Sequence, residues 1–398
     1  MKGKDIVVGV TGGIAAYKAA ELVRLLVREE ARVKVAMTAN ATRFVTPLTF
    51  EALSGNRVVW RMFGEDAGAM DHITWGQEAD LIILAPATAN FIAKVAHGLA
   101  DDFLSTMVLA ATAPILACPA MNTRMYENPV TTENLSSLKS RGLHIMSPGE
   151  GQLACRTEGP GRLPEPPDIL EEAKRCLSKQ DLAGLRVLVT AGATHEPMDP
   201  VRFISNRSTG KMGYAVAAAA CRRGASVTLV TGPTSISPPR GASVEDVQTA
   251  LEMREAVLEK ATGCDVVIMT AAVSDYRPHR SAKEKMKKGA ESLSLELDRN
   301  PDILEELGHS ENGKGCLLVG FAAETHQLMA HAMEKLKKKN LDMIVANDVS
   351  REDAGFACDT NEVKMFFRDG RVEDSPLMSK EDVADLVLDR INALRKST

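Results

Sequence analysis

Three side chains in the first half of the chain could take part in one reaction, although they lie far apart in the sequence. Asn122 belongs to the segment Pro119-Ala120-Met121-Asn122, downstream of His72 and upstream of Cys155. A histidine can exchange protons, a carboxamide can hydrogen-bond a carboxylate, and a thiol can donate a proton. Each also has a structural explanation, because His72 could be partly buried, Asn122 could cap a helix and Cys155 could be a packed thiol.

A second group of candidate residues lies in the other half. Arg202 and Asn206 belong to the run Asp199-Pro200-Val201-Arg202-Phe203-Ile204-Ser205-Asn206. The next segment, Gly210-Lys211-Met212-Gly213, is not a P-loop, since Met212 stands where a serine or threonine should bind magnesium. A polar loop with glycines before a helix still suits phosphate binding, and an ordinary capped helix is the alternative.

Buried strands that alternate with helices must position these residues. Continuous apolar runs predict strands in the first half at residues 6–10, 33–37, 81–85 and 114–118. The same pattern predicts strands in the second half at residues 185–190, 226–231, 264–270, 316–320 and 343–346. Such strands are typical of parallel sheets covered on both faces, so each half is predicted to be a doubly wound, Rossmann-like α/β domain.

The domain boundary is predicted near residue 184. Residues 147–167 are rich in glycine and proline and are predicted to form a long loop or flap without regular structure. A helix over 168–179 and a linker over 181–184 follow, which gives domains of residues 1–184 and 185–398. A hairpin is predicted over 362–373, with Asp369-Gly370 at its turn.

The composition restricts the class of protein. The chain has 398 residues and a net charge of −5, which argues against non-specific nucleic-acid binding because that requires a basic face. No stretch approaches the length that spans a bilayer, and the apolar run near the N-terminus is too short for a signal peptide. The seven cysteines are scattered and include no Cys-x-x-Cys pair, so we expect a cytoplasmic protein without disulfides.

Three loops are expected to meet at one edge of the first sheet. Gly12-Gly13 follows the first predicted strand and can bring backbone N–H groups close to an anion, although the dinucleotide fingerprint is absent. Thr38 and the segment Pro86-Ala87-Thr88-Ala89-Asn90 follow two further strands. Ligands bind at the carboxyl edge of such sheets, which favours a phosphate-bearing cofactor here.

Ordered motifs cover the whole first half, namely Thr11-Gly12-Gly13-Ile14-Ala15-Ala16-Tyr17-Lys18, His72-Ile73, Ala85-Pro86-Ala87-Thr88-Ala89-Asn90, Pro119-Ala120-Met121-Asn122 with Met125-Tyr126, and Ala154-Cys155 ahead of Gly159-Pro160-Gly161-Arg162. This set resembles the flavin-containing cysteine decarboxylases, in particular phosphopantothenoylcysteine decarboxylase. The resemblance implies that fold and an FMN site formed by Gly12, Gly13, Ile14, Thr38, Pro86, Ala87, Thr88 and Asn90.

The resemblance also implies roles for the three reactive side chains. A flavin is needed because oxidation of the substrate thiol to a thioaldehyde creates the electron sink that decarboxylation requires. His72 would assist as base or electrostatic partner, Asn122 would bind the substrate carboxylate, and Cys155 would donate the final proton. Arg156 stands where relatives usually carry glycine. Because the flavin site of this family forms between subunits, a homo-oligomer built on trimers is expected.

The second half carries its own ordered motifs, namely Thr190-Ala191-Gly192, Glu196-Pro197, Asp199-Pro200-Val201-Arg202, Asn206, Gly210-Lys211-Met212-Gly213, Ala271-Ala272-Val273, Asp275-Tyr276, Lys285-Met286-Lys287-Lys288, Asn300-Pro301-Asp302-Ile303, Gly320-Phe321-Ala322-Ala323-Glu324-Thr325, Asn340-Leu341-Asp342 and Ala346-Asn347-Asp348-Val349. They resemble phosphopantothenate–cysteine ligase of the bacterial, CTP-using type. That resemblance implies that the carboxylate of 4′-phosphopantothenate attacks the α-phosphate of CTP to give an acyl-cytidylate and pyrophosphate. The amine of L-cysteine then displaces CMP to form the amide.

By the same resemblance, Lys285 would neutralise phosphate charge in the first step, and Asn206, with Arg202 beside it, would contact the acyl phosphate in the second. The residues implied to hold CTP are Asp275, Lys285, Pro301, Asp302, Ile303, Phe321, Lys335 and Lys339. Magnesium or manganese would bridge the triphosphate, with Asp275 as a candidate ligand.

Together the two resemblances imply a bifunctional enzyme of coenzyme A biosynthesis, in which the ligase product is the decarboxylase substrate. Two alternatives stay open on the same fold, a flavin-binding regulatory protein and a flavin-modifying transferase. The set of His72, Asn122 and Cys155 argues against a pure binding protein, and the ligase-like half argues against the transferase.

Overall fold

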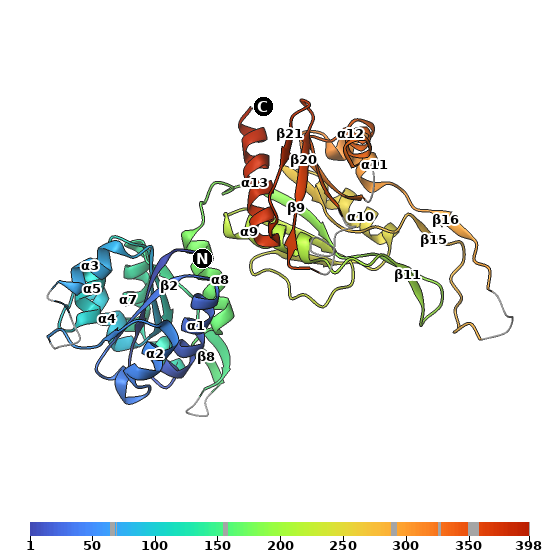
Figure 1. Ribbon diagram of the computed structural model, residues 1–398. Helices are drawn as coiled ribbons and strands as arrows, with labels where there is room; N and C mark the ends of the chain where they lie inside the picture. Colours follow the sequence, from blue (N-terminus) through green and yellow to red (C-terminus); the bar gives the residue numbers. More distant parts are fainter. Residues whose placement is uncertain are drawn as a thin grey trace. The chain divides into compact units, whose positions relative to one another are not determined.

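The computed structural model describes residues 1–63, 68, 70–153, 158–287, 293–324, 328–348 and 358–397. The chain forms two compact units, Met1–Ser178 and Lys179–Thr398 (Figure 1). Each unit has a central sheet and its own apolar core. Among the described residues, no helix has both the length and the apolar character needed to cross a lipid bilayer.

A parallel sheet forms the centre of the first unit. In the described residues it has six strands in the order β3-β2-β1-β4-β5-β6. The strands are β1 (Asp5–Val10), β2 (Arg32–Met37), β3 (Val58–Val59), β4 (Leu81–Ala87), β5 (Ile115–Pro119) and β6 (His144–Ile145). The strand order reverses between β1 and β4, and loops that follow these two strands diverge to leave room for a ligand there.

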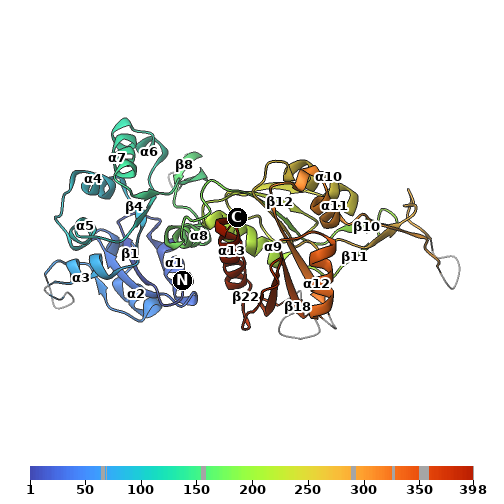
Figure 2. The ribbon, with the colours of Figure 1, turned by 90° about the horizontal axis from the view of Figure 1, so that it is seen from above.

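Helices cover both faces of this sheet (Figures 1 and 2). The residues Ile6 and Val8 of β1 pack in one apolar core, whereas Val7, which points the other way, packs in another. The first core includes residues of α1 (Ala16–Arg28), α2 (Pro47–Ser54) and α8 (Pro166–Leu177). The second includes residues of α3 (Asp71–Glu78), α4 (Ala89–His97), α5 (Phe103–Leu109) and α7 (Pro129–Ser140). The short helices η1 (Ala41–Arg43) and α6 (Thr123–Tyr126) complete this unit.

The prediction that residues 147–167 lack regular structure was wrong. They contain the antiparallel strands β7 (Gly149–Gln152) and β8 (Glu158–Arg162), and α8 begins at Pro166. Gly161 has a φ of +142°, and a Cβ there would lie 2.2 Å from the carbonyl oxygen of Met121. The glycine therefore lets β8 approach the loop after β5, where the N–H of Met121 donates to the carbonyl of Gly161 at 3.0 Å. Cys155 and Arg156 lie outside the described residues.

The second unit is built on a larger, mixed sheet. Its described strands follow the order β13-β12-β9-β14-β17-β18-β20-β21, with parallel pairing from β13 to β18 and antiparallel pairing from β18 to β21. The strands are β9 (Arg186–Ala191), β12 (Ser226–Thr231), β13 (Ser243–Asp246), β14 (Val266–Met269), β17 (Leu317–Glu324), β18 (Met343–Asp348), β20 (Val363–Phe367) and β21 (Val372–Asp374). The hairpin predicted over residues 362–373 is confirmed.

Helices again cover both faces of the sheet. The helices α9 (Lys211–Arg222) and α13 (Lys380–Ser397) share one apolar core with alternate residues of β9. The helices α10 (Ala250–Ala261), α11 (Ile303–His309) and α12 (Leu328–Lys338) contribute to the core on the other face. Outside the sheet lie η2 (Glu311–Gly313) and the short strands β10 (His195–Pro197), β11 (Phe203–Ser205), β15 (Tyr276–Pro278), β16 (Leu297–Arg299), β19 (Thr360–Asn361) and β22 (Met378–Ser379). The pairs β10–β11 and β15–β16 extend away from the sheet of this unit (Figures 1 and 2).

Candidate functional site

A large cavity lies at the carboxyl edge of the first sheet. It has a volume of about 1140 Å³ and is lined by the loops that follow β1, β2, β4 and β5. Seven of the residues predicted to hold a cofactor line it, together with one predicted catalytic residue: Gly12, Gly13, Ile14, Thr38, Pro86, Thr88, Asn90 and Asn122. Ala87, which was also predicted to contact the cofactor, has a fully buried side chain and is not among the described residues that line the cavity.

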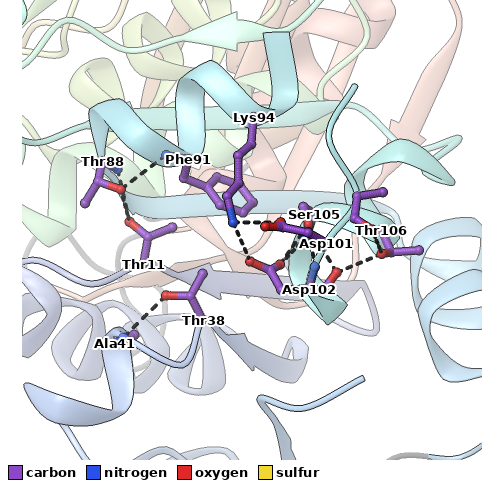
Figure 3. A network of polar contacts seen from close by, with 11 residues as sticks. Thr11, Thr38, Ala41, Thr88, Phe91, Lys94, Asp101, Asp102, Ser105 and Thr106 are labelled. Atoms are coloured by element: carbon purple, nitrogen blue, oxygen red, sulfur yellow. Dashed lines mark hydrogen bonds and ion pairs between the residues drawn. The ribbon is translucent and has the colours of Figure 1, made fainter. Parts of the chain in front are cut away.

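A buried hydroxyl fixes two of these loops to each other (Figure 3). The Oγ1 atom of Thr11 donates to the carbonyl of Pro86 at 2.7 Å and accepts from the N–H of Thr88 at 3.0 Å. Thr88 in turn caps α4, since its hydroxyl accepts from the N–H of Phe91 at 3.4 Å. The loop after β1 and the start of α4 are therefore held as one assembly at the cavity.

The beginning of α1 faces the cavity and suits an anion. Ala15 occupies the N-cap position and makes no side-chain cap, and the N–H groups of Ala16 and Lys18 donate to the carbonyls of Gly13 and Ala15, both at 3.0 Å. The helix start therefore offers an anion mainly its positive dipole end. Gly12 is required for close packing, because a Cβ there would lie 2.5 Å from the Cβ of Asn40. A Cβ on Gly13 would meet no described atom nearer than 3.5 Å, so this glycine leaves space on the cavity side. A phosphate group fits such a helix start.

The cavity also contains a charged cluster that no sequence motif indicated. Lys94 of α4 donates from Nζ to Asp101 at 2.7 Å and to Asp102 at 3.3 Å, and Lys94 and Asp102 both line the cavity (Figure 3). Burial lowers the pKa of Lys94, but the contacts with the two carboxylates outweigh it and raise this pKa overall. Asp102 caps α5 by accepting from the N–H of Ser105 at 2.8 Å. The lysine is therefore held as a cation at one wall.

Of the three reactive side chains of the first half, the described residues place Asn122 at the cavity. Asn122 lines the cavity, and its Oδ1 accepts the N–H of Arg124 at 2.9 Å as the N-cap of α6. His72 lies in the first turn of α3 and is not among the described residues that line the cavity. Cys155 lies outside the described residues, between β7 and β8.

In the second unit, Asn206 connects two loops at the carboxyl edge of the sheet. Its Nδ2 donates to the carbonyl of Ala272 at 3.1 Å and to that of Val273 at 3.2 Å, in the loop after β14. The adjacent helix α9 begins after Gly210, which has a φ of +82°. A Cβ on Gly213 in its first turn would lie 2.3 Å from Thr270 Oγ1, so the start of the helix packs directly on the sheet edge.

Several residues predicted to hold a nucleotide also lie close together. Asp302 caps α11 and forms an ion pair with Lys339, with Oδ2 and Nζ 2.8 Å apart. Burial raises the pKa of Asp302, but the hydrogen bond and charge of Lys339 outweigh it, so this pKa lies below its ordinary value. Asp275 is exposed, and its carbonyl accepts from the N–H of Asn300 at 2.8 Å.

Three further residues of this predicted set have different surroundings. Ile303 is buried in the core that includes α10, α11 and α12, whereas Phe321 on β17 packs against the core that includes α9 and α13. Lys335 belongs to α12. Among the described residues, no group of three or more histidine, cysteine, aspartate or glutamate side chains is placed to hold a metal ion.

Comparison with known proteins decides the family. The model of the Flavoprotein family matches residues 1–178, and that of the DNA/pantothenate metabolism flavoprotein C-terminal domain matches residues 182–394. The chain is 49% identical over 403 residues to the coenzyme A biosynthesis bifunctional protein CoaBC of Bacillus subtilis (strain 168), a match that covers 100% of this chain and 99% of that protein. The chain belongs to the CoaBC family.

Other members of the CoaBC family match over the same length. The protein of Escherichia coli (strain K12) is 48% identical over 396 residues, covering 98% of this chain and 97% of its own. Among solved structures, the C-terminal domain of a CoaBC protein is 42% identical, covers 55% of this chain and 100% of its own, and gives a TM-score of 0.48. A PPC decarboxylase mutant complexed with pantothenoylaminoethenethiol is 28% identical, covers 44% and 97%, and gives a TM-score of 0.39.

Membership of the CoaBC family confirms the expected function at the level of the whole chain. The protein is a bifunctional enzyme of coenzyme A biosynthesis with a flavoprotein decarboxylase domain and a ligase domain. The match extends over both halves, which neither a flavin-binding regulatory protein nor a flavin-modifying transferase explains.

Proposed function

We propose that residues 1–184 decarboxylate 4′-phosphopantothenoyl-L-cysteine with FMN, and that residues 185–398 make this compound from 4′-phosphopantothenate, L-cysteine and CTP. The observation that carries the proposal is the convergence of four loops on one cavity, with Asn122 in its wall. The product of the second unit is the substrate of the first, so one chain would carry out two consecutive steps.

FMN fits the residues that line this cavity. The volume of about 1140 Å³ slightly exceeds the roughly 300–1,000 Å³ of typical cofactor sites, which leaves space for a substrate beside the cofactor. The start of α1, with Gly12 and Gly13, would hold the phosphate, and Thr38, Thr88 and Asn90 would lie along the remaining part. Bound FMN would accept two electrons from the substrate thiol before the carboxyl group leaves and would return them afterwards, so that the overall reaction is redox-neutral.

The protein side chains would then bind the substrate and move protons. The carboxamide of Asn122 would hydrogen-bond the substrate carboxylate, and its cap on α6 fixes it at the wall. The imidazole of His72 would act as base or electrostatic partner, and Sγ of Cys155 would return a proton to the product. By the family resemblance the flavin site forms between subunits, so a second subunit would supply His72 in a homo-oligomer built on trimers.

In the second unit, the proposed chemistry depends on positioning and charge neutralisation. Lys285 would neutralise phosphate charge while the carboxylate attacks CTP, and Asn206, with Arg202 nearby, would contact the acyl phosphate. CTP would be held by Asp275, Lys285, Pro301, Asp302, Ile303, Phe321, Lys335 and Lys339. The described residues form no metal site of their own, so magnesium or manganese would arrive with the triphosphate, with Asp275 as a candidate ligand.

A cytoplasmic location is also part of the proposal. The described residues Cys118, Cys176, Cys264 and Cys316 are thiols outside any disulfide, as is usual in a reducing compartment.

The proposal is tested by incubating the full chain with 4′-phosphopantothenate, cysteine, CTP and magnesium. CMP and 4′-phosphopantetheine should both form, and the purified protein should carry a yellow flavin. Asn122→Ala should reduce carbon dioxide release at least 100-fold, on the order of 2.7 kcal/mol of lost transition-state binding, while CMP formation stays at the wild-type rate.

The matched control for this variant is Asn128→Ala. Asn128 caps α7 and accepts from the N–H of Val130 at 3.0 Å, in the same way that Asn122 caps α6, but it does not line the cavity. It should lose helix stability without losing carbon dioxide release. Equal loss of carbon dioxide release in both variants, or equal loss of both activities in Asn122→Ala, would contradict the proposal.

A further inference from the structure

Asp199 is a buried carboxylate to which the proposed function gives no role. Its side chain is 0% exposed, although it lies in a connecting segment between β10 and β11. A buried charge is costly unless hydrogen bonds satisfy it, so the donors around Asp199 indicate what it does. Five hydrogen bonds reach its two oxygens from two separate segments of the described chain.

The two oxygens of Asp199 have different partners. Oδ1 accepts the N–H groups of Val201 and Arg202, both at 2.8 Å, and so forms a local turn. Oδ2 accepts Nε of Arg202 at 3.0 Å, Nη2 of Arg202 at 2.7 Å and the N–H of Met286 at 3.2 Å. Only Oδ2 therefore connects the turn to a segment more than eighty residues away.

Arg202 completes this connection from the other side of Met286. Its Nη2 also donates to the carbonyl of Met286 at 2.8 Å, so the N–H and the carbonyl of one residue are both held. A further bond joins the same two segments, from the N–H of Ala282 to the carbonyl of Met198 at 2.9 Å. We call this set of contacts, made by Met198, Asp199, Arg202, Ala282 and Met286, the Asp199 clasp.

The clasp holds an irregular segment of the chain. Residues 281–287, all within the described part of the chain, form neither helix nor strand. Lys285 immediately precedes Met286, and its side chain is exposed. A long lysine on an irregular segment loses much conformational freedom when it must meet a phosphate. Fixing the adjacent peptide removes part of that cost before the substrate binds.

The carboxylate is suited to a permanent role of this kind. Burial raises the pKa of Asp199, but the hydrogen bonds from Val201, Arg202 and Met286 outweigh it, and the pKa lies far below its ordinary value. The group is therefore held as the carboxylate, the form in which both oxygens accept hydrogen bonds.

We propose that Asp199 is a positioning residue that acts through Lys285, and that Arg202 serves this clasp through its contacts with Asp199 and Met286. This inference rests on the proposed role of Lys285 in the reaction with CTP. It adds a function for the buried carboxylate and explains why the lysine can lie on an irregular segment and still meet the triphosphate at a defined point.

The first test measures the clasp without any substrate. Asp199→Asn keeps the size of the side chain and one oxygen for the local turn, but it replaces the second acceptor with an NH₂ group. Hydrogen–deuterium exchange of the full chain should show the Met286 amide exchanging about tenfold faster, as expected when a hydrogen bond of about 1.4 kcal/mol is lost. Arg202→Lys keeps the charge but loses the planar guanidinium group with its several N–H donors. It should also make the Met286 amide exchange faster.

A matched control is available in the hairpin of the same unit. Asp369 accepts the N–H of Arg371 at 3.0 Å and its Nε at 2.6 Å, in an exposed turn between β20 and β21. Asp369→Asn should leave exchange at Met286 unchanged. If Asp199→Asn and Arg202→Lys both leave the Met286 amide as protected as in the wild type, the clasp is refuted.

The second test asks whether Asp199 acts through Lys285. Asp199→Asn should slow CTP-dependent pyrophosphate release about tenfold in the wild-type background. In the Lys285→Ala background it should slow this reaction by less than about twofold, because the lysine that Asp199 positions is absent. This double-mutant cycle measures the coupling between the two residues. The same loss in both backgrounds overturns the positioning role, since a merely structural residue would act independently of Lys285. If the wild type releases no pyrophosphate from CTP, the proposed function itself fails, whereas the exchange experiment still decides whether the clasp exists.

Discussion

Replacing Thr11 with valine should weaken flavin binding by separating the two loops that this hydroxyl joins. Valine has nearly the same shape but can neither donate to the carbonyl of Pro86 nor accept from the N–H of Thr88. Pro86 keeps one partner, because the N–H of Thr11 also donates to its carbonyl at 3.3 Å. The N–H of Thr88 loses the hydroxyl, so the loop that starts α4 is free to shift.

The magnitude follows from these partners. A backbone N–H group that loses its hydrogen-bond partner in a half-buried site lowers the free energy of unfolding by about 1–3 kcal/mol. For a unit of this size each kcal/mol shifts the unfolding temperature by about 2–4 °C, so the melting temperature of the first unit should fall by roughly 2–12 °C. Since both loops line the cavity, flavin should bind at least about tenfold more weakly, which corresponds to about 1.4 kcal/mol.

Two measurements separate stability from binding in this variant. The two tryptophans of the chain, Trp60 and Trp75, both belong to the first unit, so tryptophan fluorescence follows the unfolding of that unit. Titration of the flavin-free protein with FMN gives the affinity. Thr11→Ser keeps the hydroxyl and loses a buried methyl group, so it should cost about 0.5–1.5 kcal/mol of stability but bind flavin like the wild type. Wild-type affinity in Thr11→Val would refute the reasoning.

Three further predictions concern the two glycines of one loop and an ion pair. Gly12→Ala should destabilise the first unit by about 1–3 kcal/mol, because its new methyl group would overlap Asn40, as a lower tryptophan-monitored melting temperature will show. Gly13→Ala should keep that temperature but bind FMN more weakly; unchanged affinity would mean that the cofactor does not approach this residue. The pKa of Asp302 is lowered beside Lys339, so its contribution to stability is full above the ordinary value of 3.8 and is lost as the pH falls through the lower, folded-state value. Urea unfolding followed by circular dichroism should show a weaker loss of stability at acid pH in Asp302→Asn, and an unchanged pH dependence would contradict this assignment.

Much of the fold could be predicted because its signal is local. The apolar run at residues 81–85 predicted the strand that extends as β4 from Leu81 to Ala87. A fully buried parallel strand needs apolar side chains on both faces, so its pattern is visible without knowledge of its neighbours. The same reasoning placed Gly12, Thr38 and Thr88 at one sheet edge, where the cavity lies.

The segment around β7 and β8 could not be predicted in this way. Its glycines and prolines resemble those of a loop, and the strand pairing depends on the close approach of Gly161 to Met121, forty residues earlier. The cavity lysine was missed for a related reason. Nothing in the sequence around Lys94 indicates that its ammonium group will meet the two carboxylates that precede α5.

The sequence by itself determined the two α/β units, the order of their strands along the chain and the motifs that carry the chemistry. Hydrophobic periodicity and ordered motifs are properties of neighbouring residues, and they survive without any long-range contact. Only the tertiary structure decided that Thr11 joins Pro86 to Thr88 and that Asp199 holds Met286. These contacts depend on hydrogen-bond geometry between segments far apart in the chain, which is defined only when the sheets have brought those segments together.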